Sequence, residues 1–149
     1  MLRFPMSKHL PDRSTVLLAD EELLERLAKS TLTSDCFHHA DHVRAAFLYL
    51  RQYSLLEAVE KFSDALRRQA AAHGNAERYH QTITWAYMFL IHERMARAGN
   101  PQDWREFAQQ NPDLLSWNDN TVKRYYRPET LQSDLARKIF VFPDGACGT

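Results

Sequence analysis

The helical spacing of apolar residues between Ser54 and Gly99 restricts the fold of this chain more than any other feature of its sequence. Ser54-Leu55-Leu56-Glu57 matches the capping box that begins many helices. From there to Gly74, apolar residues recur every three or four positions: Ala58, Val59, Phe62, Ala65 and Leu66. We therefore expect an amphipathic helix that presents one face to a core.

A longer periodic segment, Ala76 to Ala98, is followed by Gly99, a typical residue after a helix end. It is apolar on two faces, one with Ile83, Ala86, Tyr87 and Leu90 and the other with Trp85, Met88 and Phe89. A helix that is apolar on two sides is buried on two sides. We expect this segment to be the central helix of a bundle.

Weaker patterns extend the helical prediction to the rest of the chain. We expect a helix after Asp20 as N-cap, a second over residues 38–53, and a fifth after Asn100-Pro101 that carries Trp104 and Phe107. Short helical pieces follow at residues 114–117, 122–126 and 135–139. With 149 residues and only 4 glycines, the chain fits one domain and not a turn-rich β fold.

The predicted architecture is a single all-α domain over residues 1–149. It is a helical bundle with a long central helix and a C-terminal tail of short helices packed across it. We expect residues 1–18 and 144–149 to be extended or flexible.

Composition excludes several classes of function. The 19 basic residues balance the 19 acidic ones, which argues against nucleic acid as a partner. No stretch approaches the ~20 apolar residues of a membrane span, and the first ten residues lack the apolar core of a secretory signal. Cys36 and Cys147 are interpreted as reduced thiols of a cytoplasmic protein, with a ligand role left open for Cys36. We expect a small-molecule substrate or ligand as partner, no membrane partner, and leave a homodimer open.

The most suggestive residues are two histidines of the second helix. At about 100° per residue, His39 aligns with the apolar stripe through Val43. His42 lies roughly 60° to one side on the same face, whereas Asp41 points nearly opposite. The two imidazoles are therefore expected to face the core one helical turn apart.

A third histidine is predicted to join them from the central helix. His80 shares the face of Ile83 and Tyr87 on that helix, whereas His92 lies on the opposite face. His39, His42 and His80 form a candidate open three-histidine site for zinc or iron. No zincin motif is present, and the two Glu-x-x-His motifs that di-iron bundles use are absent.

Two further residues of the central helix are candidate pocket residues with catalytic roles. Arg94 continues the inward stripe, and a buried guanidinium needs a carboxylate, a phosphate or an aromatic partner. Tyr87 is the tyrosine best placed to line a pocket. For Arg94, a structural ion pair with a carboxylate nearer the C-terminus is the favoured alternative.

The motifs Phe37-x-His39-x-x-His42-x-Arg44 and Tyr79-His80-x-Thr82 resemble those of an uncharacterised family of small bacterial all-helical proteins. The resemblance covers most of the chain and implies a helical fold, without implying an activity. In that family Glu often follows the histidine of the second motif, where this chain has Gln81. By angle, Gln81 faces away from His80.

Three hypotheses for function remain. In the first, a metal at His39, His42 and His80 acts as Lewis acid or activates water, with Tyr87 and Arg94 lining the pocket. In the second, His39 or His42 is a metal-free general base for a small acidic substrate held by Arg94. In the third, the protein is a non-catalytic module that binds a ligand or partner, and its histidines complete the core.

Overall fold

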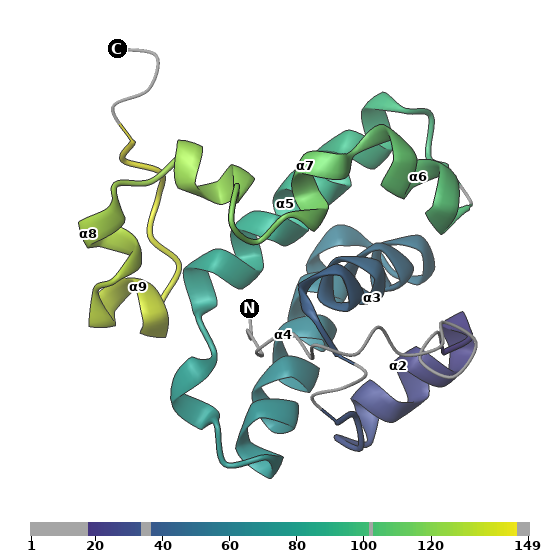
Figure 1. Cartoon of the computed structure of the whole chain (residues 1–149), viewed down its shortest axis with the longest axis horizontal. Helices are drawn as coiled ribbons and strands as arrows, with labels where there is room; N and C mark the ends of the chain where they lie inside the picture. Colours follow the sequence, from purple (N-terminus) through teal and green to yellow (C-terminus); the bar gives the residue numbers. More distant parts are fainter. Residues whose placement is uncertain (1–17, 34–36, 102, 146–149) are drawn as a thin grey trace.

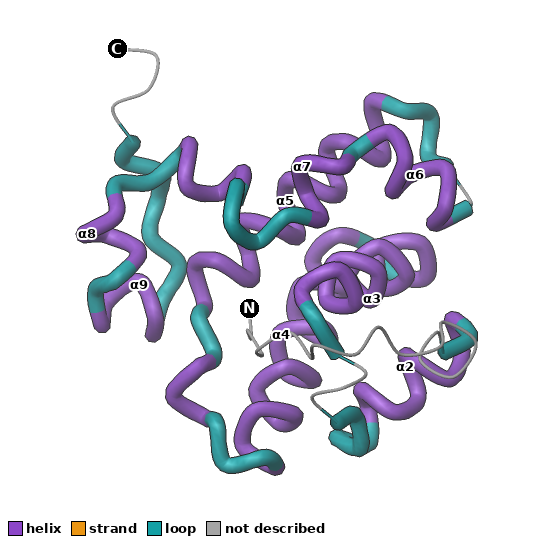
Figure 2. Tube along the Cα trace, viewed as in Figure 1, coloured by secondary structure: helices purple, strands orange, loops and turns teal. Residues whose placement is uncertain are grey.

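The computed structural model describes residues 18–33, 37–101 and 103–145, and these residues form helices, turns and loops without any strand (Figures 1 and 2). The α-helices are α2 (Asp20–Ala28), α3 (His39–Gln52), α4 (Leu55–Ala72), α5 (Gln81–Arg97), α6 (Trp104–Gln110), α7 (Pro112–Leu115), α8 (Pro128–Leu131) and α9 (Asp134–Lys138). Two 3-10 helices, η1 (Ala76–Arg78) and η2 (Thr121–Arg124), complete the set.

The core lies among α3, α4 and α5. α5 packs against α3 and α4 on one side and against η2 and α9 on the other, while α2 packs on α3 and α4. Fully buried Phe47, Phe62 and Ile91 supply apolar surface from the three core helices. The expected all-α bundle with a central helix is therefore confirmed.

Several helix ends differ from their predictions. Ser54 is the N-cap of α4, but its hydroxyl donates to the Glu57 carboxylate at 3.2 Å and makes no capping bond to the backbone. α2 begins one residue early, with Ala19 as N-cap, and the carboxylate of Asp20 pairs with Arg44 of α3 and does not cap the helix. At α6, Asp103 caps the helix by accepting from the amide of Arg105. Gly99, with φ of +77°, follows the end of α5 as expected.

The largest error concerns the start of the central helix. The expected segment from Ala76 divides into η1, an extended link, and α5, which begins at Gln81. His80 is the N-cap, with extended backbone at φ −131° and ψ 110°, and its Nδ1 accepts from the amide of Ile83 at 3.1 Å. The imidazole thus replaces the hydroxyl or carboxylate that usually satisfies a first-turn amide. His80 is therefore not on a helix face.

The C-terminal segment packs onto α5, with α8 as an additional short helix that was not predicted. The Thr82 hydroxyl donates to the carbonyl of Ile139 and accepts from the amide of Val141, at 2.8 and 3.1 Å. Between them, Phe140 stacks on Trp85 at 5.7 Å between ring centroids. Figure 1 shows α8 and α9 beside the N-terminal part of α5, apart from α2 and α3. Within the described ranges, no helix is long and apolar enough to cross a bilayer.

Candidate ligand-binding site

The structure does not bring the three candidate histidines together. Among the described residues, no group of three His, Cys, Asp or Glu side chains is arranged to hold a metal ion. Both ring nitrogens of His80 are engaged, since Nδ1 caps α5 and Nε2 lies 2.7 Å from the carbonyl oxygen of Leu131. His80 is an N-cap that ties two segments together, and the predicted face shared with Ile83 and Tyr87 does not exist.

His39 and His42 face the core, as their helical phase indicated. Nε2 of His39 donates to the carbonyl of Leu114 at 2.9 Å, and its ring contacts Tyr87 and Trp117 at centroid distances of 5.1 and 5.2 Å. His42 is fully buried, with its ring 3.9 Å from that of Phe37, and neither of its nitrogens has a hydrogen-bond partner. Both side chains contribute to packing in the structure.

Burial keeps these imidazoles neutral. Desolvation lowers the pKa of His39 and of His80 to about 4. The hydrogen bonds to the carbonyls of Leu114 and Leu131 raise these pKa values, but by less than desolvation lowers them. Desolvation also lowers the pKa of His42 well below its ordinary value. None of the three is a cation at neutral pH.

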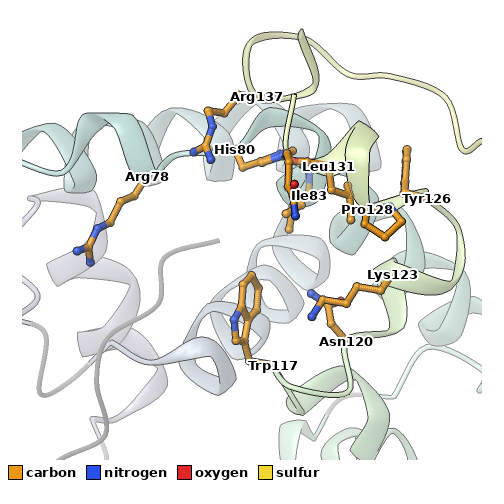
Figure 3. Close-up of a pocket in the computed structure, with 11 residues that line it drawn as sticks. Arg78, His80, Ile83, Trp117, Asn120, Lys123, Tyr126, Pro128, Leu131 and Arg137 are labelled. Atoms are coloured by element: carbon orange, nitrogen blue, oxygen red, sulfur yellow. Dashed lines mark hydrogen bonds between the residues drawn. The ribbon is translucent and has the colours of Figure 1, made fainter. Parts of the chain in front are cut away.

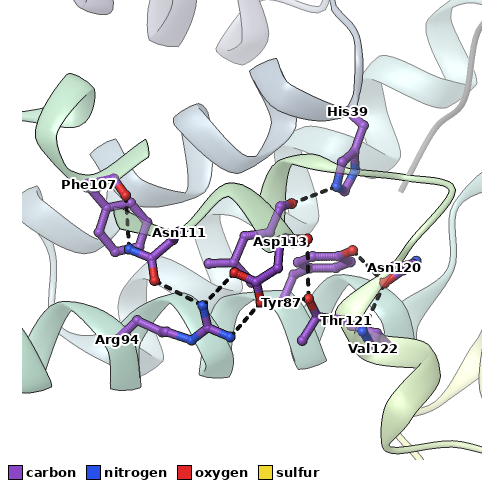
Figure 4. A network of polar contacts seen from close by, with 10 residues as sticks. His39, Tyr87, Arg94, Phe107, Asn111, Asp113, Asn120, Thr121 and Val122 are labelled. Atoms are coloured by element: carbon purple, nitrogen blue, oxygen red, sulfur yellow. Dashed lines mark hydrogen bonds and ion pairs between the residues drawn. The ribbon is translucent and has the colours of Figure 1, made fainter. Parts of the chain in front are cut away.

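Arg94 lies in a network with α7 and the segment after it (Figure 4). Its guanidinium donates to both carboxylate oxygens of Asp113, at 2.9 and 2.7 Å, and to the side-chain oxygen of Asn111 at 2.9 Å. Thr121 donates a further hydrogen bond to Asp113, and the bond with Arg94 is the main reason why the pKa of Asp113 falls to about 2. The expected carboxylate partner of Arg94 is confirmed. Asp113 binds the guanidinium that the second hypothesis uses to hold an acidic substrate.

Tyr87 orients another polar side chain. The fully buried tyrosine donates its hydroxyl to Oδ1 of Asn120 at 2.5 Å, and burial raises its pKa, so the proton stays on the donor (Figure 4). The same Oδ1 accepts from the amide of Val122 at 2.9 Å. Because Oδ1 accepts both hydrogen bonds, the orientation of the Asn120 side-chain amide is fixed. Its Nδ2 makes no hydrogen bond within the described part of the chain.

Asn120 lines a cavity of about 620 Å³ between the start of α5 and the C-terminal short helices. Figure 3 shows His80, Leu131 and Arg137 along one side and Trp117, Asn120 and Lys123 along the other. The complete lining is Arg78, His80, Ile83, Trp117, Asn120, Lys123, Tyr126, Pro128, Leu131, Gln132 and Arg137. Neither Tyr87 nor Arg94 belongs to it.

The charges of this lining have one sign. Arg78, Lys123 and Arg137 are cationic, and no carboxylate of the described residues is part of the wall. Arg137 is held in place by donating to the carbonyl of Glu77 at 2.7 Å, whereas the side chain of Lys123 makes neither an ion pair nor a hydrogen bond with a described residue. The chain as a whole has no net charge, but the cations of this lining produce a local positive potential in the cavity.

This cavity could not be predicted from the sequence. Its cations lie on η1, η2 and α9, which are short elements far apart in the chain, and no spacing or motif connects them. Gln81 is outside the lining, and its side-chain oxygen accepts hydrogen bonds from Tyr79 and Arg67.

Comparison with known proteins adds no assignment, since the chain matches no protein-family model, no curated protein and no solved structure. The resemblance of its two histidine motifs to a bacterial family therefore stays a prediction. Cys36 and Cys147 lie outside the described residues, as do residues 1–17 and 146–149 of the ends expected to be flexible, 1–18 and 144–149. Asp144 and Gly145 are held in place, because the Asp144 carboxylate accepts from the amide of Arg127 at 3.0 Å and the amide of Gly145 donates to the carbonyl of Tyr125 at 2.8 Å.

Proposed function

We propose that this protein is a cytoplasmic module that binds a small organic anion in the cavity between α5 and the C-terminal helices. The observation that carries the proposal is the cavity lining, which has three cations and no carboxylate of the described residues around apolar and aromatic walls. Its volume of about 620 Å³ lies within the range of small-molecule sites.

The two kinds of lining residue favour a ligand with two parts. Ile83, Leu131 and the ring of Trp117 offer surface to an apolar or planar body. Lys123, Arg137 and the Nδ2 of Asn120 offer donors to a carboxylate or phosphate. An aromatic acid or an aromatic phosphate ester satisfies both requirements.

The geometry lends less support to the two catalytic hypotheses. A three-histidine metal site needs a nitrogen of His80, and both are used in the backbone contacts that fix the start of α5. A general base needs access to substrate, and neither His39 nor His42 lines the cavity. Arg94 is engaged with Asp113 and does not reach a substrate there. Ligand binding with structural histidines is the reading that these contacts favour.

Calorimetric titration with benzoate, phenyl phosphate, neutral benzamide and cationic benzylamine tests the proposal. We expect the two anions to bind, benzamide to bind at least about tenfold more weakly, and benzylamine not to bind. Rising salt should weaken anion binding, because the cavity is open to solvent and its charges are screened. Equal affinity for benzoate and benzamide would overturn the proposal.

Lys123→Gln is the informative variant, since this exposed side chain makes no ion pair or hydrogen bond with a described residue. We expect it to weaken binding of phenyl phosphate about tenfold, which corresponds to ~1.4 kcal/mol. Lys138→Gln removes an exposed lysine of α9 that does not line the cavity and is the matched control. Identical affinities in the two variants would place the anion elsewhere.

A further inference from the structure

Hydrogen-bond donors lie on two opposite sides of the cationic cavity. Asn120 and Lys123 are on the side of Trp117, whereas Arg137 lies across the cavity beside His80 (Figure 3). The volume of about 620 Å³ is within the range of pockets for drug-sized ligands. The cavity therefore has room for a molecule that reaches both sides.

The donors of the first side come from one turn of η2. Asn120 is the N-cap of this 3-10 helix, and the amide of Lys123 donates to the carbonyl of Asn120 at 3.1 Å. Residues three apart in a 3-10 turn share a face, so both side chains are directed to the same part of the cavity. Asn120 is only 3% exposed, yet its unpartnered Nδ2 is not enclosed by protein and is open to the cavity. We call Asn120 Nδ2 and Lys123 Nζ the η2 donor pair.

The donor of the second side is the guanidinium of Arg137. One of its N–H groups donates to the carbonyl of Glu77, and its other N–H groups make no hydrogen bond or ion pair within the described ranges. The bond to Glu77 fixes the position of the group and leaves donors for a ligand. Arg78, the third cation of the lining, precedes His80 by two residues and adds its positive charge on this side.

Apolar residues separate the two sets of donors. Ile83, Leu131 and the ring of Trp117 contribute apolar surface to the lining. One anionic group cannot hydrogen-bond with both sides of the cavity at once, since hydrogen bonds need distances of about 3 Å. A ligand that carries an anionic group at each end of an apolar or planar body satisfies both sides.

We propose that the ligand of this cavity is a two-headed organic anion, with one carboxylate or phosphate on the η2 donor pair and the other on Arg137. The inference rests on the proposed function and narrows its ligand class. Terephthalate, with carboxylates at opposite ends of one ring, is the simplest probe. Phthalate has the same charge with both carboxylates on one side of the ring and is the matched control. A biphenyl dicarboxylate, with one carboxylate at each end, covers a wider separation of the donors.

Calorimetric titration compares each two-headed probe with its monoacid, benzoate or biphenyl carboxylate. We expect the better of the two probes to bind at least about tenfold tighter than its monoacid, and phthalate to stay within about threefold of benzoate. If benzoate binds more tightly than benzamide but neither probe shows this gain, or phthalate shows the same gain, the two-headed ligand is refuted and the proposed function stands. If none of these anions binds, both are refuted.

Substitution of Arg137 tests the position of the second head. Arg137→Gln should reduce the tenfold gain of the better probe over its monoacid to about onefold, whereas Arg137→Lys, which keeps the charge, should retain most of it. Lys138→Gln, at the neighbouring exposed residue outside the lining, should leave the gain unchanged. Thermal unfolding of each variant checks that the fold is retained. An unchanged gain in Arg137→Gln would overturn the proposal.

Discussion

Mild acid is expected to destabilise this protein through its buried histidines. Desolvation holds the pKa of His39 and His80 at about 4 in the folded chain, against an ordinary value of 6.5. Between these values the unfolded state binds more protons than the folded state, so the free energy of unfolding falls as the pH falls. The effect is absent above about pH 7 and grows as the pH drops from 6.5 toward 4.

The size of this loss follows from the difference between the pKa of each histidine in the folded and in the unfolded chain. At pH 5, about 1.5 pH units below the unfolded pKa, each histidine lowers the free energy of unfolding by about 2 kcal/mol. The two together amount to about 4 kcal/mol, a large share of the 5–15 kcal/mol typical of a domain. His42 acts in the same direction, whereas Asp41, whose pKa burial raises, acts in the opposite one.

Urea unfolding followed by tryptophan fluorescence at pH 7 and pH 5 measures this loss. His80→Asn keeps a side-chain acceptor at the N-cap of α5, so it should fold and lose about 2 kcal/mol of the pH-dependent difference, the contribution of one histidine. His92→Gln replaces an exposed histidine of α5 and is the matched control. A difference below about 1 kcal/mol between the two pH values, or an unchanged difference in His80→Asn, would refute the reasoning.

Three further substitutions test individual contacts. Asp113→Asn should lower the free energy of unfolding by about 2 kcal/mol at pH 7, because the pKa near 2 reflects its bond to Arg94; a loss under about 0.5 kcal/mol in urea unfolding contradicts this. Tyr87→Phe releases Asn120 and should weaken phenyl phosphate binding by calorimetry about threefold or more, whereas unchanged affinity removes the orienting role. His42→Leu removes two unpartnered nitrogens from the core and should preserve or raise the melting temperature; a lower melting temperature contradicts this.

Helical periodicity was enough to predict the bundle, because α3, α4 and α5 each bury a recurring apolar face. The same periodicity correctly placed His39 and His42 toward the core. It failed at His80, since a helical phase assigned from Ile83 and Tyr87 holds only if the helix extends back to that residue. An imidazole as N-cap lies outside the usual set of capping residues, so the sequence offered no indication of the break.

The cavity was beyond sequence reasoning for a different reason. Arg78, Lys123 and Arg137 belong to short helices whose positions depend on tertiary contacts and not on local propensity. Asn120 acquires its orientation from Tyr87, which lies 33 residues earlier in the chain. The sequence predicted that Arg94 faces inward and needs a carboxylate partner. Which carboxylate it binds, Asp113, depends on the position of α7, which the sequence does not give.

The hydrogen bond from His80 to the carbonyl of Leu131 joins parts of the chain 51 residues apart, and both residues line the cationic cavity. An anion bound as proposed would therefore lie against both residues of this link, which joins the cap of α5 to the end of α8. Occupancy then raises the energy of local opening for α8 and α9 relative to the rest of the bundle. Amide hydrogen exchange in these two helices becomes a measure of how full the cavity is.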